Sequence, residues 1–145
     1  AARETRASRL LATPGTPVSA PRPPRQTVLV VDDEPLIADL VAHALRDEGY
    51  AVRVAADGVW ALAAAEDAAP DLLLSDVRMP RMNGVNLARE LRDRHPDLPV
   101  ILFSAQYDGL DYPELGVRFL PKPFDLSALL AAVAEELSGD RKDLP

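Results

Sequence analysis

The stretch VLVVDDEP at residues 28–35 places four apolar residues directly before two aspartates. A short run rich in β-branched residues and bounded by polar ones is typical of a strand buried on both faces. Pro35 stands where a helix can begin, and the apolar residues after it keep helical spacing until Gly49. This stretch therefore predicts the start of a βαβ unit, in which helices cover a parallel sheet.

The same alternation of strand and helix continues along the chain. Further strands are predicted at 51–55, 71–75, 100–103 and 117–120, and further helices at 58–67, 85–94 and 126–137. Residues 105–116 stay ambiguous because Gly109, Pro113 and Gly116 interrupt any helix there. The rhythm predicts an α/β protein with right-handed crossovers and one parallel sheet.

Charge and composition divide the chain into a tail and a body. The chain has 145 residues, the length of one domain, and no Cys. Residues 1–26 are rich in Pro and carry five Arg against one Glu, whereas the other 119 residues hold 11 basic and 22 acidic groups. We expect a disordered tail or linker over 1–26, a folded domain over 27–138 and a C-terminal tail over 139–145.

These features exclude several classes of function. A body with a formal charge of −11 repels nucleic acid, so we expect no nucleic-acid partner. The longest apolar run, Val59–Ala65, is too short to cross a membrane, and no signal peptide is evident. The absence of Cys suits a reducing compartment, so the expected location is the cytoplasm.

Polar residues follow the predicted strands at their carboxyl ends, where ligands bind in open parallel sheets. Asp32 and Asp33 follow the first strand, Asp76 the third, Ser104 the fourth and Lys122 the fifth. Three carboxylates at one edge repel one another by up to about 4 kcal/mol per pair at an effective dielectric near 20. A divalent cation and Lys122 would compensate them, and all-oxygen ligands favour magnesium, with manganese also possible. Lys122 is one of only two Lys beside 14 Arg, and a compact ammonium suits a contact with a phosphoryl oxygen.

Four motifs in this order resemble the receiver domains of two-component response regulators. They are VLVVDDEP at 28–35, DVRMPRMNG at 76–84, FSA at 103–105 and FLPKPF at 119–124. The resemblance implies a flavodoxin-like three-layer sandwich with a five-stranded parallel sheet of order 2-1-3-4-5. The segment between Ser104 and Lys122 is shorter than is usual in the family, so we expect a shortened or irregular fourth helix.

The resemblance also implies a role for each matching residue. Asp76 corresponds to the acceptor of a phosphoryl group from a phosphohistidine. The family's Mg²⁺ ligands correspond to Asp33, Asp76 and the backbone carbonyl of Arg78. Asp32 corresponds to a residue that acts on the metal largely through a water. Ser104 corresponds to the hydroxyl that binds the phosphoryl group, Lys122 to its paired lysine, Phe119 to the switch aromatic, and Pro123 to a proline after a cis bond.

The expected partners are a cognate histidine kinase or a histidine phosphotransfer protein, with an unknown downstream protein target. We expect the domain to have no enzymatic activity beyond its own phosphoryl transfer and to be a monomer or weak dimer. It is expected to be either a stand-alone regulator or the terminal receiver of a hybrid histidine kinase. Two alternatives stay open. One is a pseudo-receiver that is not phosphorylated; the other is an aspartyl phosphotransferase or phosphatase, whose nucleophile would belong to an Asp-x-Asp pattern, whereas Asp32 and Asp33 are adjacent.

Overall fold

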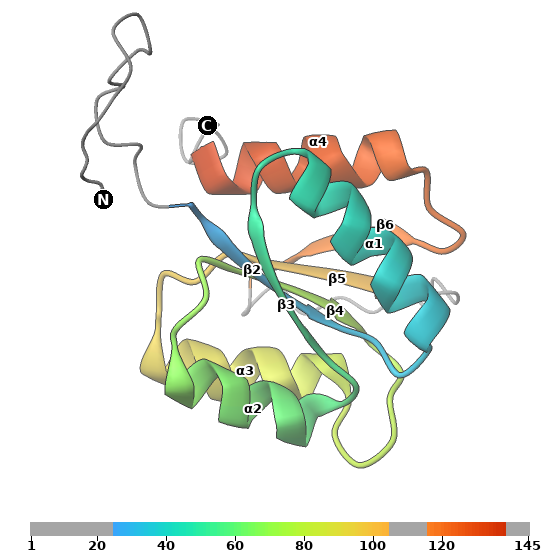
Figure 1. The fold of residues 1–145 in the computed structure, drawn as a ribbon. Coiled ribbons are helices and arrows are strands. Elements are labelled where there is room, and N and C mark those ends of the chain that lie inside the picture. The colour runs from blue at the N-terminus through green and yellow to red at the C-terminus, as the bar shows by residue number, and fades with distance from the viewer. Residues whose placement is uncertain (1–24, 105–115, 139–145) are drawn as a thin grey trace, which may run out of the picture.

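Five parallel strands form one sheet in the order β3-β2-β4-β5-β6 (Figure 1). The structure is a computed structural model and describes residues 25–104 and 116–138. Along the chain, the strands are β2 (Thr27–Val31), β3 (Ala51–Ala55), β4 (Leu72–Asp76), β5 (Val100–Ser104) and β6 (Arg118–Pro121). This is the order 2-1-3-4-5 when the strands are counted from the first, so the predicted topology is confirmed.

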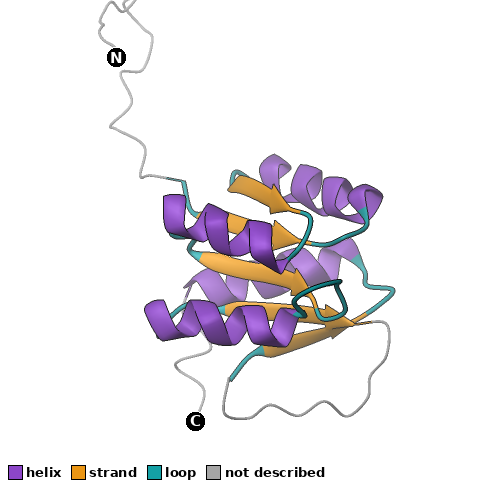
Figure 2. Cartoon of the chain, turned by 90° about the horizontal axis from the view of Figure 1, so that it is seen from below, coloured by secondary structure: helices purple, strands orange, loops and turns teal. Residues whose placement is uncertain are grey.

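Helices cover both faces of the sheet, which gives three layers (Figures 1 and 2). The helices are α1 (Pro35–Asp47), α2 (Gly58–Asp67), α3 (Gly84–Arg94) and α4 (Leu126–Ser138). α1 and α4 lie together on one face, and α2 and α3 lie together on the other (Figure 1). In the part of the chain that the structure describes, no helix is long and apolar enough to cross a bilayer.

The central strands are buried on both faces, as their apolar runs predict. Successive residues point to opposite faces, so Val28 and Val30 pack under α1 and α4 while Leu29 and Val31 pack under α2 and α3. β4 and β5 are buried over their whole length, Asp76 and Ser104 included. The apolar core therefore ends at the edge of the sheet where the polar side chains begin.

Short polar side chains cap the beginnings of α2 and α3. Asp57 caps α2 by accepting a hydrogen bond from the backbone N–H of Trp60, and Asn83 caps α3 in the same way through Asn86. Gly49 ends α1 with a φ of +99°, a left-handed conformation that favours glycine. These caps set the length of the loops that carry the polar side chains.

Most predicted elements form within one residue of the expected bounds. The third and fifth strands are each displaced by one residue, to Leu72–Asp76 and Arg118–Pro121. Asp71, just before β4, bonds to Thr27 through both its N–H and its carboxylate. Asp76 is the last residue of β4. The predicted tails and the shortened fourth helix fall largely on 1–24, 105–115 and 139–145, outside the described residues, and stay predictions.

Candidate functional site

Polar residues from four strands meet at the carboxyl edge of the sheet. Asp32 follows β2, Asp76 ends β4 and Ser104 ends β5, and these three side chains are buried. Lys122 comes directly after β6, and its backbone N–H donates to the Ser104 carbonyl at 2.8 Å. The parallel topology thus joins residues as far as 90 positions apart in the sequence.

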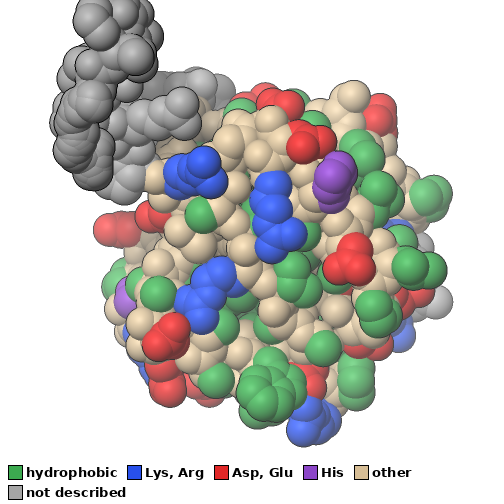
Figure 3. Space-filling model, in the orientation of Figure 1, with side chains coloured by type: hydrophobic (Ala, Val, Ile, Leu, Met, Phe, Trp, Pro, Cys, Tyr) green, Lys and Arg blue, Asp and Glu red, His purple; other side chains and the backbone are tan. Residues whose placement is uncertain are grey.

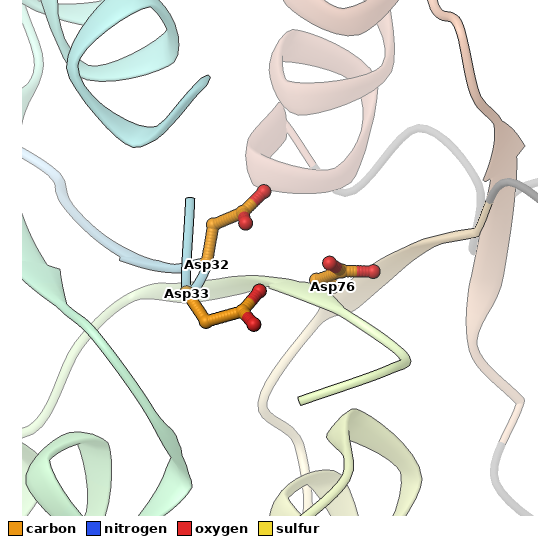
Figure 4. A group of neighbouring side chains, drawn as sticks. All are labelled: Asp32, Asp33 and Asp76. Atoms are coloured by element: carbon orange, nitrogen blue, oxygen red, sulfur yellow. The ribbon is translucent and has the colours of Figure 1, made fainter. Parts of the chain in front are cut away.

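Three carboxylates form the centre of this site. Asp32 and Asp33 extend from the end of β2 beside Asp76 (Figure 4), and one oxygen from each lies within 4.8 Å of the others. Asp32 and Asp76 are buried, whereas Asp33 is exposed. The cluster therefore has a dry inner part and a side open to solvent, as a site that exchanges small anions or cations requires.

The ammonium of Lys122 lies between the two buried carboxylates. Its Nζ is 3.2 Å from Asp76 Oδ2 and 3.4 Å from Asp32 Oδ2. The side chain passes over the ring of Phe103, with Nζ 5.0 Å from the ring centroid. Because this ring and the polypeptide around it limit access of water, the Lys122 side chain is only 15% exposed, and its charge is weakly screened.

Burial and charge shift the acid–base properties of these groups. Burial raises the pKa of Asp32 and of Asp76, although Lys122 and nearby backbone N–H groups oppose the rise. Burial alone would lower the pKa of Lys122, but Asp76 and Asp32 more than compensate and the pKa is raised. Lys122 is therefore positively charged at neutral pH, and it stabilises the ionised form of the two carboxylates.

The loop between β4 and α3 closes tightly on Asp76. Gly84 donates its N–H to the Val77 carbonyl at 2.8 Å, and the N–H of Val77 donates to Phe103 on β5 at 3.0 Å. A Cβ on Gly84 would lie 2.2 Å from the Asp76 carbonyl oxygen, so only glycine fits there. The N–H of Arg78 donates to Asp76 Oδ1 at 3.3 Å, which holds Arg78 beside this carboxylate.

The remaining predicted residues lie on or after β6. The Lys122–Pro123 peptide bond is cis. Phe119 stands opposite Leu102 of β5 and packs, partly buried, against the core under α2 and α3. Ser104 stands opposite Pro121 in the same register. Every residue predicted for the site thus lies at the carboxyl edge of the sheet except Phe119, which lies within β6.

Sequence reasoning missed two residues of the site. The Glu34 carboxylate lies 3.7 Å from Lys122 Nζ and is mostly exposed; its position directly after the aspartate pair was an available signal. Glycine is required at position 84 because of the close contact with Asp76, and not because the backbone is left-handed there. No local sequence pattern predicts such a contact.

The site fits a small divalent cation. The ligand candidates are all oxygens, which Mg²⁺ and Mn²⁺ prefer to nitrogen or sulfur. Asp32, Asp33, Asp76 and Lys122 together carry a formal charge of −2, which a dication would neutralise.

A cluster of aspartates with a paired lysine, at the carboxyl edge of a doubly wound α/β sheet, is typical of a class of phosphoryl-accepting signalling domains. The sequence profile of the family "Response regulator receiver domain" matches residues 28–134. The chain therefore belongs to the response regulator receiver family. Receiver domains are signalling modules rather than typical enzymes, and they bind Mg²⁺ at an aspartate cluster.

Individual relatives agree with this assignment. Over 119 residues the chain is 40% identical to the DNA-binding transcriptional regulator NtrC of Salmonella typhimurium, covering 79% of this chain and 25% of NtrC. It is 37% identical over 118 residues to the DNA-binding response regulator MtrA of Mycolicibacterium smegmatis, covering 78% of this chain and 51% of MtrA. The chain thus spans about half of MtrA and a quarter of NtrC.

Solved structures give the same result. The receiver domain of the hybrid histidine kinase CckA matches with a TM-score of 0.67 and 38% identity, over 77% of this chain and 98% of that one. The response regulator TrrA of Thermotoga maritima, in complex with Mg²⁺-BeF, matches with a TM-score of 0.71 and 32% identity, over 77% of this chain and 99% of that one. The structural likeness covers nearly the whole of each of these two chains.

Proposed function

We propose that Asp76 of this receiver domain accepts a phosphoryl group from a phosphohistidine in a Mg²⁺-dependent reaction. The observation that carries the proposal is the place of Lys122, whose ammonium lies within 3.4 Å of carboxylate oxygens of both Asp76 and Asp32. An ammonium beside a carboxylate nucleophile can stabilise the charge that develops on a transferred phosphoryl group.

The chain's own residues would divide the work of the transfer. A carboxylate oxygen of Asp76 attacks phosphorus, the N–P bond of the phosphohistidine breaks, and its electron pair returns to the imidazole nitrogen. Lys122 then shares its charge between Asp32 and the new phosphoryl oxygens. The Ser104 hydroxyl, at the end of the neighbouring strand, donates a hydrogen bond to the phosphoryl group.

Magnesium would be held by Asp33, Asp76 and the backbone carbonyl of Arg78, with Asp32 acting through a water. When bound, the cation supplies charge neutralisation for the phosphoryl oxygens. One oxygen from each of the three aspartates lies within 4.8 Å of the others, which supports this assignment.

The signal would leave the site through Ser104 and Phe119. Movement of Ser104 towards the phosphoryl group frees space that the partly buried Phe119 ring can fill, and this changes the protein-binding face around β6. Nuclear magnetic resonance with and without beryllofluoride tests the step. Amide shifts that stay unchanged from 104 to 124 on binding of the mimic would disprove it.

The partner that supplies the phosphoryl group is a histidine kinase or a histidine phosphotransfer protein, and the downstream target is a protein. The likeness to the CckA receiver supports an origin in a hybrid kinase, and the likeness to NtrC and MtrA supports a response regulator. In either setting the domain acts by contact between proteins.

Incubation with acetyl phosphate and Mg²⁺, followed by intact mass measurement, tests the acceptor. We expect the wild-type chain to gain one phosphoryl group and Asp76→Asn to gain none. Asp71→Asn is the matched control, because Asp71 lies just before the opposite end of β4 and its carboxylate also accepts a backbone hydrogen bond. No gain by the wild type would favour the pseudo-receiver alternative, and steady turnover of phosphoesters would favour an enzyme.

A further inference from the structure

An ion pair outside the predicted site joins the loop after β4 to the helix after β3. Arg81, in the loop between Asp76 and α3, donates a hydrogen bond from Nη2 to Oδ2 of Asp57 at the N-terminus of α2. The Asp57 side chain is 10% exposed and that of Arg81 is 58% exposed. Charged side chains of both signs are scattered over the face of the molecule shown in Figure 3. We propose that this pair fixes the apex of the loop and thereby sets the affinity of the aspartate cluster for Mg²⁺. Arg81 is then a positioning residue, and this role rests on the proposed function.

The backbone of Arg81 adopts a conformation that is uncommon for a residue with a side chain. Its φ is +72°, in the left-handed region that disfavours residues with a Cβ and favours glycine. Within the described residues, Arg81 is the only residue other than glycine with a positive φ. A local turn contributes to this conformation, because the N–H of Met82 donates to the Pro80 carbonyl at 2.8 Å, and the Arg81 guanidinium adds a contact with Asp57 outside the loop.

Asp57 is a fixed anchor for this contact. Its Oδ1 accepts the N–H of Trp60 at 2.9 Å and so caps α2, while Oδ2 accepts from Arg81. The Trp60 N–H bond and Arg81 together lower the pKa of Asp57, so the carboxylate stays charged. Asp57 also follows Ala55 by two residues, and the Ala55 carbonyl accepts the N–H of Asp32 at 3.2 Å. The anchor therefore belongs to the polypeptide that flanks the aspartate cluster.

A second contact also joins the apex of the loop to α2. Met82 packs against Gly58, the first residue of α2, where an added Cβ would lie 2.9 Å from the Met82 Cβ. The ends of the loop are already closed by the bond between Gly84 and Val77. Arg81 and Met82 add contacts with α2 from outside the loop, beyond the loop's own bond from the Met82 N–H to the Pro80 carbonyl at 2.8 Å. Arg78, three residues before Arg81, lies in the same loop next to Val77, and its N–H donates to Asp76 Oδ1.

The physical consequence is a difference in metal affinity. A backbone carbonyl binds a cation well only if the loop presents it without further ordering, because ordering on binding reduces the affinity. Groups that hold a metal ligand directly change affinity by roughly 10-fold to 100-fold when they are removed. Arg81 acts one step further away, so we expect Arg81→Gln to weaken Mg²⁺ binding by about threefold to tenfold.

Isothermal titration calorimetry of Mg²⁺ on the whole chain, without a phosphoryl donor, tests the proposal. Arg81→Gln, Asp57→Asn and the double variant form a cycle, in which the substitution Asp57→Asn retains a side-chain oxygen that can cap α2. We expect each single variant to weaken Mg²⁺ binding and the double variant to be no weaker than either. Arg81→Lys should restore part of the affinity.

The matched control is Arg94→Gln. Arg94 of α3 pairs with Glu66 of α2 at 2.8 Å, so this pair joins α3 to α2 at their C-terminal ends, away from the loop that carries Arg81. We expect Arg94→Gln to leave Mg²⁺ affinity unchanged. Equal weakening in Arg94→Gln would assign the effect to general packing of α2 on α3 and overturn the proposal, as would wild-type affinity in Arg81→Gln or additive effects in the double variant.

Two further measurements distinguish positioning from loss of structure. In metal-free protein, hydrogen exchange at the amides of Met82 and Gly84 should accelerate in Arg81→Gln, and unchanged exchange would contradict the proposal. With acetyl phosphate, Arg81→Gln should need more Mg²⁺ for half-maximal rate yet approach the wild-type rate at saturation. If the wild type binds Mg²⁺ with the expected coupling but is not phosphorylated, the proposed function fails and this inference stands.

Discussion

Replacing Lys122 by glutamine should destabilise the metal-free protein, and Mg²⁺ should remove much of the loss. The ammonium lies 3.2 Å from Asp76 and 3.4 Å from Asp32, in a position only 15% exposed. The substitution keeps a polar side chain of similar reach but leaves two buried carboxylates without their cation. A dication at the same carboxylates would replace the missing charge.

The magnitude follows from these distances. At an effective dielectric near 20, each contact is worth about 5 kcal/mol of attraction, before the cost of burying the charges is subtracted. Breaking a buried pair by removing one partner costs about 3–5 kcal/mol. Because the cluster is open to solvent at the exposed Asp33, which allows partial screening of the carboxylates, we expect a smaller loss of about 2–3 kcal/mol in the free energy of unfolding at pH 7.5.

Urea denaturation with and without Mg²⁺ measures this loss. The ammonium and the cation neutralise the same oxygens, so Mg²⁺ should bind the variant at least about tenfold more tightly than the wild type and narrow the stability gap by about 1.4 kcal/mol. Arg118→Gln is the control: Arg118 on β6 pairs with Glu135 at 2.7 Å, away from the cluster. A gap for Lys122→Gln that stays constant or widens with Mg²⁺ would refute the reasoning.

Three other substitutions test the site and its surroundings. Asp76→Asn should raise the free energy of unfolding of the metal-free protein at pH 7, because burial raises the pKa of Asp76 and its ionisation opposes folding. The gain should be on the order of 1 kcal/mol, since solvent screening keeps this electrostatic effect small. A loss of stability in urea denaturation would contradict this. Gly84→Ala should lower the free energy of unfolding by about 2 kcal/mol or more, since the new Cβ would meet the Asp76 carbonyl oxygen, and an unchanged urea midpoint would show that the loop can move aside. Asp57 has a lowered pKa, so its contribution to stability is present above the ordinary carboxyl pKa and is lost as pH falls through the lowered value. Asp57→Asn should therefore reduce the dependence of the thermal unfolding midpoint on acid pH. A pH profile identical to that of the wild type would count against the pairing of Asp57 with Arg81.

Much of the fold was predictable because its signals are local. The apolar runs of β2 and β4 and the caps at Asp57 and Asn83 depend on neighbours within a few residues. The bounds of β4 and of β6 were each one residue off, and at the start of β4 the Asp71 carboxylate accepts from Thr27, a residue 44 positions away. Periodicity alone carries no information about such a partner.

The site was predictable in composition but not in geometry. The rule that parallel strands present their carboxyl ends at one edge was enough to bring Asp32, Asp76 and Lys122 together. Which oxygen of Asp76 accepts from Lys122 and which from Arg78 depends on the packing of side chains from β2, β4 and β6. The contact of Glu34 with Lys122 depends on the same packing.

The sequence by itself determined the alternation of strands and helices and the chemical groups at the strand ends, because both are written in residues that are adjacent along the chain. The tertiary structure alone decided that Lys122 lies between two carboxylates, that Gly84 must lack a side chain, and that Arg81 reaches Asp57. These contacts join residues 8 to 90 positions apart, and they exist only once the strands are in register and the loops have closed over the edge of the sheet.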